Sequence, residues 1–561
     1  MTVPPYLREL FPPARWLPRY HAAWLGRDAL AGITLAAYAI PVSLAYATLA
    51  GLPPEAGIYC YLVAGIAYAL FGSSPQLAIG PTSAISLLVG TTVIGMAGGD
   101  LAKRAQIAAL AALLLAAMSF LAWALRLSSL VSFISETILL GFKAGAALVI
   151  AMTQLPKLFG LPGGGDHFFE QVWALGGQLP DTKPAVLAFG VAALALLLVG
   201  ERLFPARPVA LVVVIASIVA LSVTPLAGLG FKTVGVLPAG LPHLEPPALR
   251  PREVYGLIPL ALACFLLAYI EGVAAARALA QKNGDEIDPG QELFALAAAN
   301  CAAGFGHGFP VTGGLSQSAV NDNAGARSPL SLVFASAAIA ACLLFLTGLL
   351  RNLPDVVLAA IVLVAVMHLI DIAELRRVWA LSRMEFSVAI AAFAGVLVLG
   401  ILEGVLLAAV FSILLLIGRT AHPHVARLGR VPGTRVYSDL ARHPDNEEVP
   451  GVLIVRVEAG ILYFNVSHVR AEVHRYAAEA GDGLRLVVWD LSASSYVDIA
   501  GVRLLSEFQR TLAARGVTLR IVDALSTVRE LIRLEMGTSA GEISRRISID
   551  DAIAGTVPGK G

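Results

Sequence analysis

Long apolar runs alternate with short polar breaks through residues 27–420 of this chain. A helix needs about 20 apolar residues to cross the roughly 30 Å hydrocarbon core of a bilayer, so we predict membrane-spanning segments in two sets of seven. The first set is 28–50, 55–71, 76–97, 104–126, 132–155, 184–203 and 207–226, and the second is 255–280, 291–307, 311–325, 328–350, 355–371, 385–402 and 403–419. Because seven is odd, the two sets cross in opposite senses, which predicts an α-helical polytopic membrane protein with a 7+7 inverted repeat of 14 transmembrane helices.

The third segment of each set is interrupted. Residues 78–89 read AIGPTSAISLLV and residues 309–320 read FPVTGGLSQSAV. Each has an apolar lead-in, then Gly and Pro breakers, then small hydroxyl residues that open a helical pattern. A helix N-terminus carries roughly half a positive charge and unpaired N–H groups, so two such ends facing each other near the midplane would hold an anion. Interrupted segments at corresponding positions of two halves indicate the substrate site of a transporter.

The pattern changes after about residue 422. Strand patterns at 452–459, 461–466, 484–492 and 517–524 alternate with helical patterns that begin at 467, 501 and 527. This alternation predicts a small α/β domain with an open sheet. We therefore divide the chain into an N-terminal cytoplasmic segment (1–26), a transmembrane transporter domain (27–420), a linker (421–449), a cytoplasmic α/β domain (450–540) and a C-terminal tail (541–561).

Composition agrees with a membrane protein. The chain is 57% hydrophobic and 14% charged, against about 25% charged residues in soluble proteins. Its net charge of +1 and the placement of Lys and Arg at segment ends argue against binding to nucleic acid. With both termini inside, most of these basic residues face the cytoplasm. No removable signal peptide is visible, so we expect the first span to direct insertion.

No pattern typical of an enzyme is present in the sequence. The four cysteines lack CxxC spacing, so we expect buried thiols, with neither a metal site nor a disulfide framework. We find no Ser/His/Asp, Cys/His or metal-ligand cluster and no phosphate-binding loop. We therefore predict that the protein is not an enzyme and needs no cofactor or metal.

Glu271 interrupts the apolar run FLLAYIEGVAAA in the eighth segment. An ionised carboxylate at the centre of a span costs about 2.5 to 3.5 kcal/mol. One interpretation is structural, with Glu271 pairing to a hydroxyl or to Lys143. The other is ion coupling, because a carboxylate beside an anion site repels the substrate unless a proton or a sodium ion neutralises it. We favour proton coupling, with sodium as the alternative.

Four sequence stretches together resemble one family of transporters. They read AYATLAGLPPEAGIY (45–59), IGPTSAIS (79–86), PVTGGLSQSAVNDNAGARSPL (310–330) and WDLSASSYVDIAG (489–501). The chain resembles the sulfate permease (SulP) family of anion transporters, which carry a C-terminal STAS domain. The resemblance implies a core domain and a gate domain, an anion held between the third and tenth helices, and a homodimer. It also associates the position of Glu271 with ion coupling.

The resemblance also suggests site residues. Gln317 stands where many animal members of the family have a basic residue, and Val42 replaces a glutamine found in many relatives. The alternative interpretation is that the Ser and Thr residues only cap or pack broken helices. The predicted substrate-binding residues are Thr82, Ser83, Ala84, Leu315, Ser316, Gln317 and Tyr38.

The STAS-like loop has Ile499 at the position where anti-sigma antagonists carry a phosphorylated serine, so that switch is absent here. We expect this domain to serve dimer stability, trafficking or partner binding.

The sequence thus predicts a proton-coupled secondary active transporter of sulfate, bicarbonate or a dicarboxylate. A sodium-coupled bicarbonate symporter and an uncoupled anion exchanger or channel on the same fold remain alternatives. A nucleobase permease is disfavoured, because it should carry a carboxylate at the second break. We expect a multi-pass protein of a bacterial inner (plasma) membrane with both termini cytoplasmic.

Overall fold

The computed structural model describes residues 11–97, 99–128, 136–165, 167–204, 208–224, 230–248, 250–367, 369–536 and 548–555. Within them the chain forms two compact units, residues 1–412 and residues 413–561. The first ten residues of the predicted N-terminal segment, parts of the fifth and seventh predicted spans, and most of the predicted tail lie outside the described residues.

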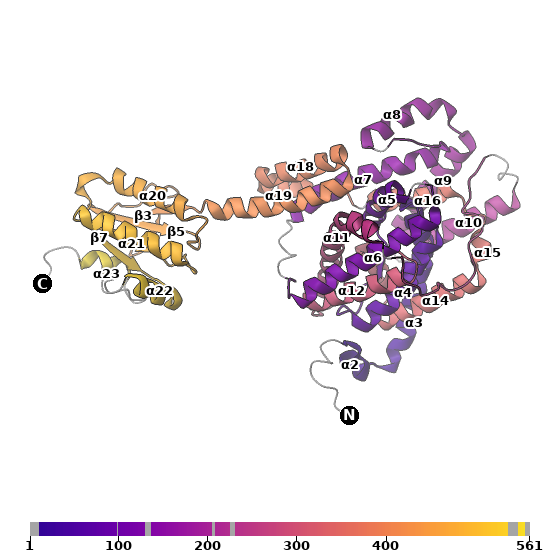
Figure 1. Cartoon of the computed structure of the whole chain (residues 1–561), viewed down its shortest axis with the longest axis horizontal. Coiled ribbons are helices and arrows are strands. Elements are labelled where there is room, and N and C mark those ends of the chain that lie inside the picture. Colours follow the sequence, from indigo (N-terminus) through magenta and orange to yellow (C-terminus); the bar gives the residue numbers. More distant parts are fainter. Residues whose placement is uncertain are drawn as a thin grey trace. The chain divides into compact units, whose positions relative to one another are not determined.

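Helices occupy all fourteen predicted spans (Figure 1). Among the described residues, seven helical segments have the length and hydropathy to cross a membrane, one of them running over Asp355–Leu381, and four more helices are apolar but shorter. The first set is α3 (Ala22–Leu49), α4 (Glu55–Phe71), α5 (Ser83–Ala97), α6 (Leu101–Ala124), α7 (Glu136–Phe159), α9 (Pro184–Leu203) and α10 (Val209–Val223). The second is α11 (Pro251–Asn283), α12 (Pro289–Phe305), α13 (Leu315–Asn323), α14 (Leu330–Phe345), α16 (Asp355–Met367), α18 (Arg383–Leu399) and α19 (Ile401–Ala421).

Several short helices were not predicted. Their sequences are too short or too polar to stand out against the spans beside them. They are α2 (Pro13–Trp16), α8 (Phe168–Gln178), α15 (Thr347–Leu350) and α17 (Ile372–Leu381).

The two breaks are short strands that pair with each other. Strand β1 (Ile79–Gly80) precedes α5, and β2 (Thr312–Gly313) precedes α13. They run antiparallel, with Ile79 opposite Gly313 and Gly80 opposite Thr312. Segments more than 230 residues apart in sequence therefore meet where both helices begin, as the inverted repeat predicts.

The helices of the first unit pack in two groups. The core group joins α12 to α4 and α6, α14 to α3 and α4, and α11 to α6, while the gate group joins α7 to α16 and α18, and α9 to α10 and α16. Small residues permit the closest approaches. A Cβ on Gly141 of α7 would lie 1.9 Å from the carbonyl oxygen of Ala389 on α18, so the two helices can approach this closely only because residue 141 is glycine.

The second unit contains a five-stranded sheet in the order β4-β3-β5-β6-β7. Strands β5 (Val452–Val457), β6 (Leu486–Asp490) and β7 (Thr518–Val522) are parallel, and β3 (Val425–Arg430) is antiparallel to both β5 and β4 (Tyr437–Asp439). One face of the sheet is covered by α20 (Val466–Glu479), α21 (Ile499–Ala514) and α22 (Ser526–Met536). Trp489 and Phe508 are buried between the sheet and these helices. The opposite face packs on α23 (Ile549–Ala554).

Three details of this unit differ from the sequence prediction. The segment expected to be a linker carries β3 and β4, whose exposed arginines mask a short strand pattern. Residues 461–466 are not a strand, because the Asn465 side chain accepts from the Leu462 N–H (2.9 Å) and donates to the Gly460 carbonyl (2.9 Å), which closes a turn. The expected tail contains α23, held to the sheet by a hydrogen bond from Arg520 to the Ala552 carbonyl (2.7 Å).

Candidate functional site

The candidate site is built on the N-termini of α5 and α13. The first hydrogen bonds of these helices run from Ser86 N–H to the Thr82 carbonyl and from Ser318 N–H to the Gly314 carbonyl. The amide groups ahead of these bonds have no acceptor within their own helices. Because β1 pairs with β2, two helix ends with partial positive charge lie next to each other.

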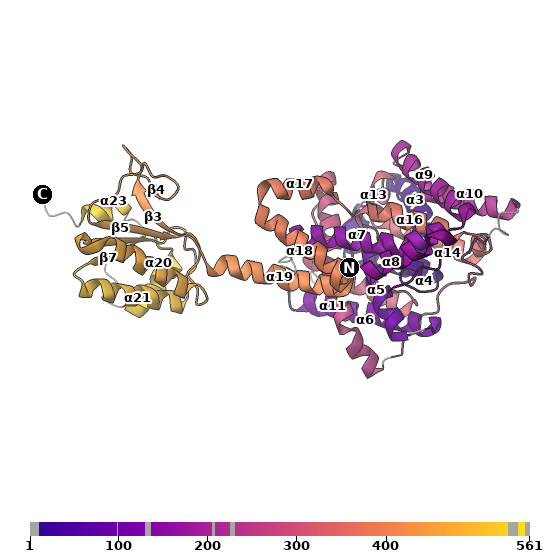
Figure 2. The ribbon, with the colours of Figure 1, turned by 90° about the horizontal axis from the view of Figure 1, so that it is seen from above.

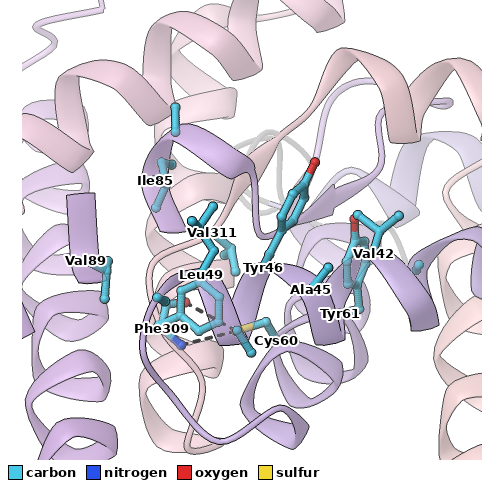
Figure 3. Close-up of a cluster of buried hydrophobic side chains, with 14 of the residues drawn as sticks. Val42, Ala45, Tyr46, Leu49, Cys60, Tyr61, Ile85, Val89, Phe309 and Val311 are labelled. Carbon is cyan, nitrogen blue, oxygen red and sulfur yellow. Dashed lines mark hydrogen bonds between the residues drawn. The ribbon is translucent and has the colours of Figure 1, made fainter. Parts of the chain in front are cut away.

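Buried polar side chains hold the two breaks in place. Asn300 of α12 donates to the Val311 carbonyl (3.0 Å) and accepts from the Val311 N–H (2.9 Å). Ser318 accepts from the Ala78 N–H (2.9 Å). The Phe309 N–H contacts the Cys60 sulfur at 3.2 Å (Figure 3). The irregular backbone is thereby satisfied inside the protein, as a membrane interior requires.

Gln317 belongs to this scaffold. It is buried (3% exposed). Its side-chain oxygen accepts from the Tyr61 hydroxyl, and its amide nitrogen donates to the carbonyls of Ala78 (3.0 Å) and Thr312 (3.2 Å). Its role as a substrate ligand stays a prediction, but both ends of its amide are already bonded within the protein. These bonds favour a structural role.

The other predicted ligands differ in access. Leu315 (59% exposed) and Ser316 are exposed, and Thr82 and Tyr38 are half-buried. Ser83 and Ala84 are buried (5% and 1% exposed). Among the predicted ligands with a side-chain hydroxyl, Thr82, Ser316 and Tyr38 are therefore the accessible ones.

Glu271 lies beside the first break. Its carboxylate is half-buried, and Thr82 Oγ1 lies 3.5 Å from Glu271 Oε2, which is a long contact for a hydroxyl–carboxylate hydrogen bond. Helix α11 is fastened to β2 by the Thr312 hydroxyl, which donates to the Ala268 carbonyl (2.6 Å). This bond fixes the turn of α11 that carries Glu271.

Two further polar groups act on this carboxylate. Tyr46 of α3 lies within electrostatic reach of both Ser83 and Glu271. Lys143 of α7 acts electrostatically on Glu271 from the gate group, but the two do not form an ion pair in the described part of the chain. The site thus places one acid beside the N-terminus of α5, and Lys143 on the opposing helix group acts on it electrostatically.

Some of these residues could not be found from the sequence. Tyr61 and Ser318 gave no signal beyond being polar in apolar segments. Asn300 likewise holds the second break, through its two bonds to the Val311 backbone.

This arrangement of paired broken helices, inward N–H groups and a membrane-embedded acid defines a multi-pass membrane transporter of small anions. The model of the sulfate permease family matches residues 25–392, and that of the STAS domain matches residues 443–542. The chain belongs to the sulfate permease family.

Curated relatives and solved structures agree with this assignment. A probable sulfate transporter of Mycobacterium tuberculosis is 35% identical over 526 residues, covering 93% of this chain and 94% of the relative. The chloroplastic sulfate transporter 4.1 of Arabidopsis thaliana is 32% identical, covering 93% of this chain and 78% of the relative. These relatives are transporters and not enzymes.

The fold is also found among solved structures. The murine solute carrier 26 family member A9 anion transporter in the inward-facing state matches with a TM-score of 0.89 at 24% identity, covering 99% of this chain and 95% of that chain. The transmembrane domain of the cyanobacterial bicarbonate transporter BicA matches with a TM-score of 0.63 at 20% identity, covering 69% of this chain and 98% of that domain.

Proposed function

We propose that this anion transporter is a proton-coupled symporter whose anion binds between the N-termini of α5 and α13. The observation that carries the proposal is the position of Glu271, 3.5 Å from Thr82 at the break that begins α5. Thr82, Ser316 and the backbone N–H groups of both helix ends supply hydrogen-bond donors. Ser83, Ala84 and Leu315 contribute through their backbone, and Tyr38 lies on the neighbouring helix α3.

The coupling follows from electrostatics. An ionised Glu271 beside the helix ends repels an incoming anion, whereas a protonated Glu271 does not and can also donate a hydrogen bond. Binding of the anion and of the proton therefore favour each other, which is the thermodynamic requirement for symport. A sodium ion at the same carboxylate would have the same effect and is the alternative. An uncoupled exchanger gains nothing from a carboxylate in this position.

Sulfate is our first candidate substrate, because the relatives that match nearly the whole chain are named sulfate transporters. Bicarbonate is the second, since the BicA domain shares the fold. The site itself offers hydroxyl and amide N–H groups that can donate hydrogen bonds to either oxyanion. We further propose a homodimer in the bacterial plasma membrane, with both termini and the STAS domain in the cytoplasm.

Uptake into proteoliposomes tests this proposal. Labelled sulfate and bicarbonate are offered to wild type and Glu271→Gln under an inward proton gradient, a sodium gradient or no gradient. We expect the proton gradient alone to drive accumulation in wild type and Glu271→Gln only to equilibrate substrate. Glu403→Gln, which removes a carboxylate from α19, is the matched control and should accumulate like wild type.

Two results would replace the proposal. Accumulation driven only by sodium would assign the coupling ion to sodium. Uptake that is independent of any gradient and equal in wild type and Glu271→Gln would indicate an exchanger or channel.

A further inference from the structure

Helix α17 connects two spans and is itself too short to cross the membrane. Its ten residues, Ile372–Leu381, extend for about 15 Å, half of the hydrocarbon thickness. It follows α16 and precedes α18, both of which occupy predicted spans. Figure 2 shows α17 alongside α18 at one end of the first unit. Unlike α13, which is shorter but forms part of a broken span, α17 falls between the predicted spans 355–371 and 385–402, which suits a position at the membrane surface.

The exposed side chains of α17 suit that position. Ile372 (57% exposed), Trp379 (51%) and Leu381 (76%) expose large apolar surface, and Met384 (54%) extends it into α18. Val378 is the buried residue of the helix. Tryptophan and aliphatic side chains of this kind are typical of helices that lie in the interface between headgroups and acyl chains.

Three arginines accompany this apolar surface. Arg376 and Arg377 lie within α17, Arg383 begins α18, and all three are exposed. Arg377 pairs with Glu374 at 3.3 Å, but both side chains are well exposed, so the pair is weak. Within the described chain, Arg376 and Arg383 form no ion pair. The segment also contains acids, but Asp371 caps α17 by accepting from the Glu374 N–H and Glu385 accepts from the Thr137 hydroxyl, so Arg376 and Arg383 stay exposed next to apolar side chains.

Trp379 and Arg383 are held in a fixed relation. The Trp379 ring packs edge-on against Phe386 of α18, with centroids 4.8 Å apart and planes at 78°. The guanidinium of Arg383 lies over the Trp379 ring, 5.4 Å from its centroid. This contact fixes one arginine and the tryptophan on α18, which packs on α7 in the gate group.

The other short amphipathic helix provides a comparison within the same molecule. Helix α8 exposes Phe169, Val172 and Trp173 but has no Lys or Arg among residues 168–178. It follows the fifth predicted span, whereas α17 follows the twelfth, so the two lie on opposite sides of the membrane. Two helices with similar apolar faces thus differ in charge, which an apolar anchoring role alone does not explain.

We infer that α17 and Arg383 form a binding site for the headgroups of anionic phospholipids. The apolar side chains enter the acyl region, and Arg376, Arg377 and Arg383 meet the phosphates. Each basic residue near an anionic membrane surface strengthens attraction appreciably, and the attraction falls off within a Debye length. Because α17 continues into α18, lipid bound there fixes the gate group at the membrane surface. The inference does not depend on which anion or coupling ion the transporter uses.

Lipid selectivity of the full-length protein tests the inference. The purified protein is reconstituted in vesicles of phosphatidylcholine mixed with phosphatidylglycerol, and the association of spin-labelled forms of both lipids is compared by electron paramagnetic resonance. We expect wild type to prefer phosphatidylglycerol, and the triple variant R376Q/R377Q/R383Q to lose up to about fivefold in selectivity for each arginine at low salt. High salt should reduce the preference of wild type toward that of the triple variant.

Two control variants separate charge from folding. R376K/R377K/R383K keeps the charge and should keep most of the selectivity, which shows that a loss in the glutamine variant is not a folding defect. R202Q removes an exposed arginine in the last turn of α9 and should leave selectivity near that of wild type. The inference is wrong if the glutamine triple variant retains the preference of wild type, if R202Q alone loses as much as the triple variant, or if the lysine variant loses as much as the glutamine variant.

Discussion

Substitution of Gln317 separates a scaffold role from a ligand role. Gln317→Leu keeps the approximate volume of the side chain but removes hydrogen bonds to the Tyr61 hydroxyl and to the Ala78 and Thr312 carbonyls. The Ala78 carbonyl retains a longer contact with the Ser318 hydroxyl (3.4 Å). The Thr312 carbonyl keeps its bond from the Gly80 N–H in the β1–β2 pair, so one buried group, the Tyr61 hydroxyl, loses its partner.

The expected loss of stability follows from this count. A buried polar group without a partner costs about 1 to 3 kcal/mol. Hydrogen bonds between membrane helices average only about 0.6 kcal/mol, which places the expected loss at the lower end of this range. Ser316→Ala is the matched control, because Ser316 is exposed and its loss should change stability by less than about 0.5 kcal/mol.

Two measurements read out the pair of variants. Thermal stability is followed by size-exclusion chromatography after heating, and anion affinity by half-saturation of uptake at a permissive temperature. We expect Gln317→Leu to lower the denaturation temperature with little change in the half-saturating concentration of the anion. We expect Ser316→Ala to raise the half-saturating concentration with little change in the denaturation temperature. A fully stable Gln317→Leu protein with weakened anion affinity would refute the scaffold role and return Gln317 to the substrate site.

Two further predictions concern packing and pH. In Gly141→Val, the Cβ alone would lie 1.9 Å from the Ala389 carbonyl oxygen. We expect the variant to lose more than about 1 kcal/mol of stability, seen as a lower yield of monodisperse protein. A wild-type yield would contradict this packing. In the STAS unit, burial by itself raises the pKa of Asp439. The hydrogen bonds with His424 (2.9 Å) and with the Ala441 N–H lower the pKa by more than burial raises it, so the pKa of Asp439 lies below its usual value. A carboxyl with a depressed pKa stabilises the folded state at pH values above its unfolded pKa, and this stability is lost as the pH falls through the folded pKa. We therefore expect the stability of His424→Ala to fall less steeply with decreasing pH, as measured by urea unfolding of residues 421–561 at several pH values. An unchanged pH dependence would contradict the assignment.

Much of the fold could be predicted because membrane spans are specified locally. A run such as residues 104–126 needs only its own apolar length to predict α6, and Gly and Pro next to hydroxyl residues are sufficient to place both breaks. Helices α8 and α17 were not predicted, because an amphipathic helix of ten or eleven residues is too short to give such a length signal. Strands β3 and β4 were not predicted, because β3 carries two arginines, β4 has only three residues, and both lie in a charged segment that resembles a linker.

The site was predictable only in part. Thr82, Ser316 and Glu271 could be singled out because each is polar at a position where the local pattern is broken or apolar. The partners of Gln317, by contrast, lie about 240 and 256 residues away in sequence for Ala78 and Tyr61. Nothing in the local pattern indicates such contacts, so the bonds by which Gln317 holds the breaks together could not be predicted, and its role as a ligand stays a prediction.

The most direct test of proton coupling is to measure proton movement caused by the anion itself. Proteoliposomes containing a pH-sensitive dye are given sulfate from outside, with no imposed proton or sodium gradient and with the membrane potential clamped. We predict that wild type acidifies the interior when sulfate enters and that Glu271→Gln exchanges labelled sulfate across the membrane without any change in internal pH. Sulfate entry into wild-type vesicles with no acidification, or acidification that persists in Glu271→Gln, would contradict the assignment of Glu271 as the coupling site.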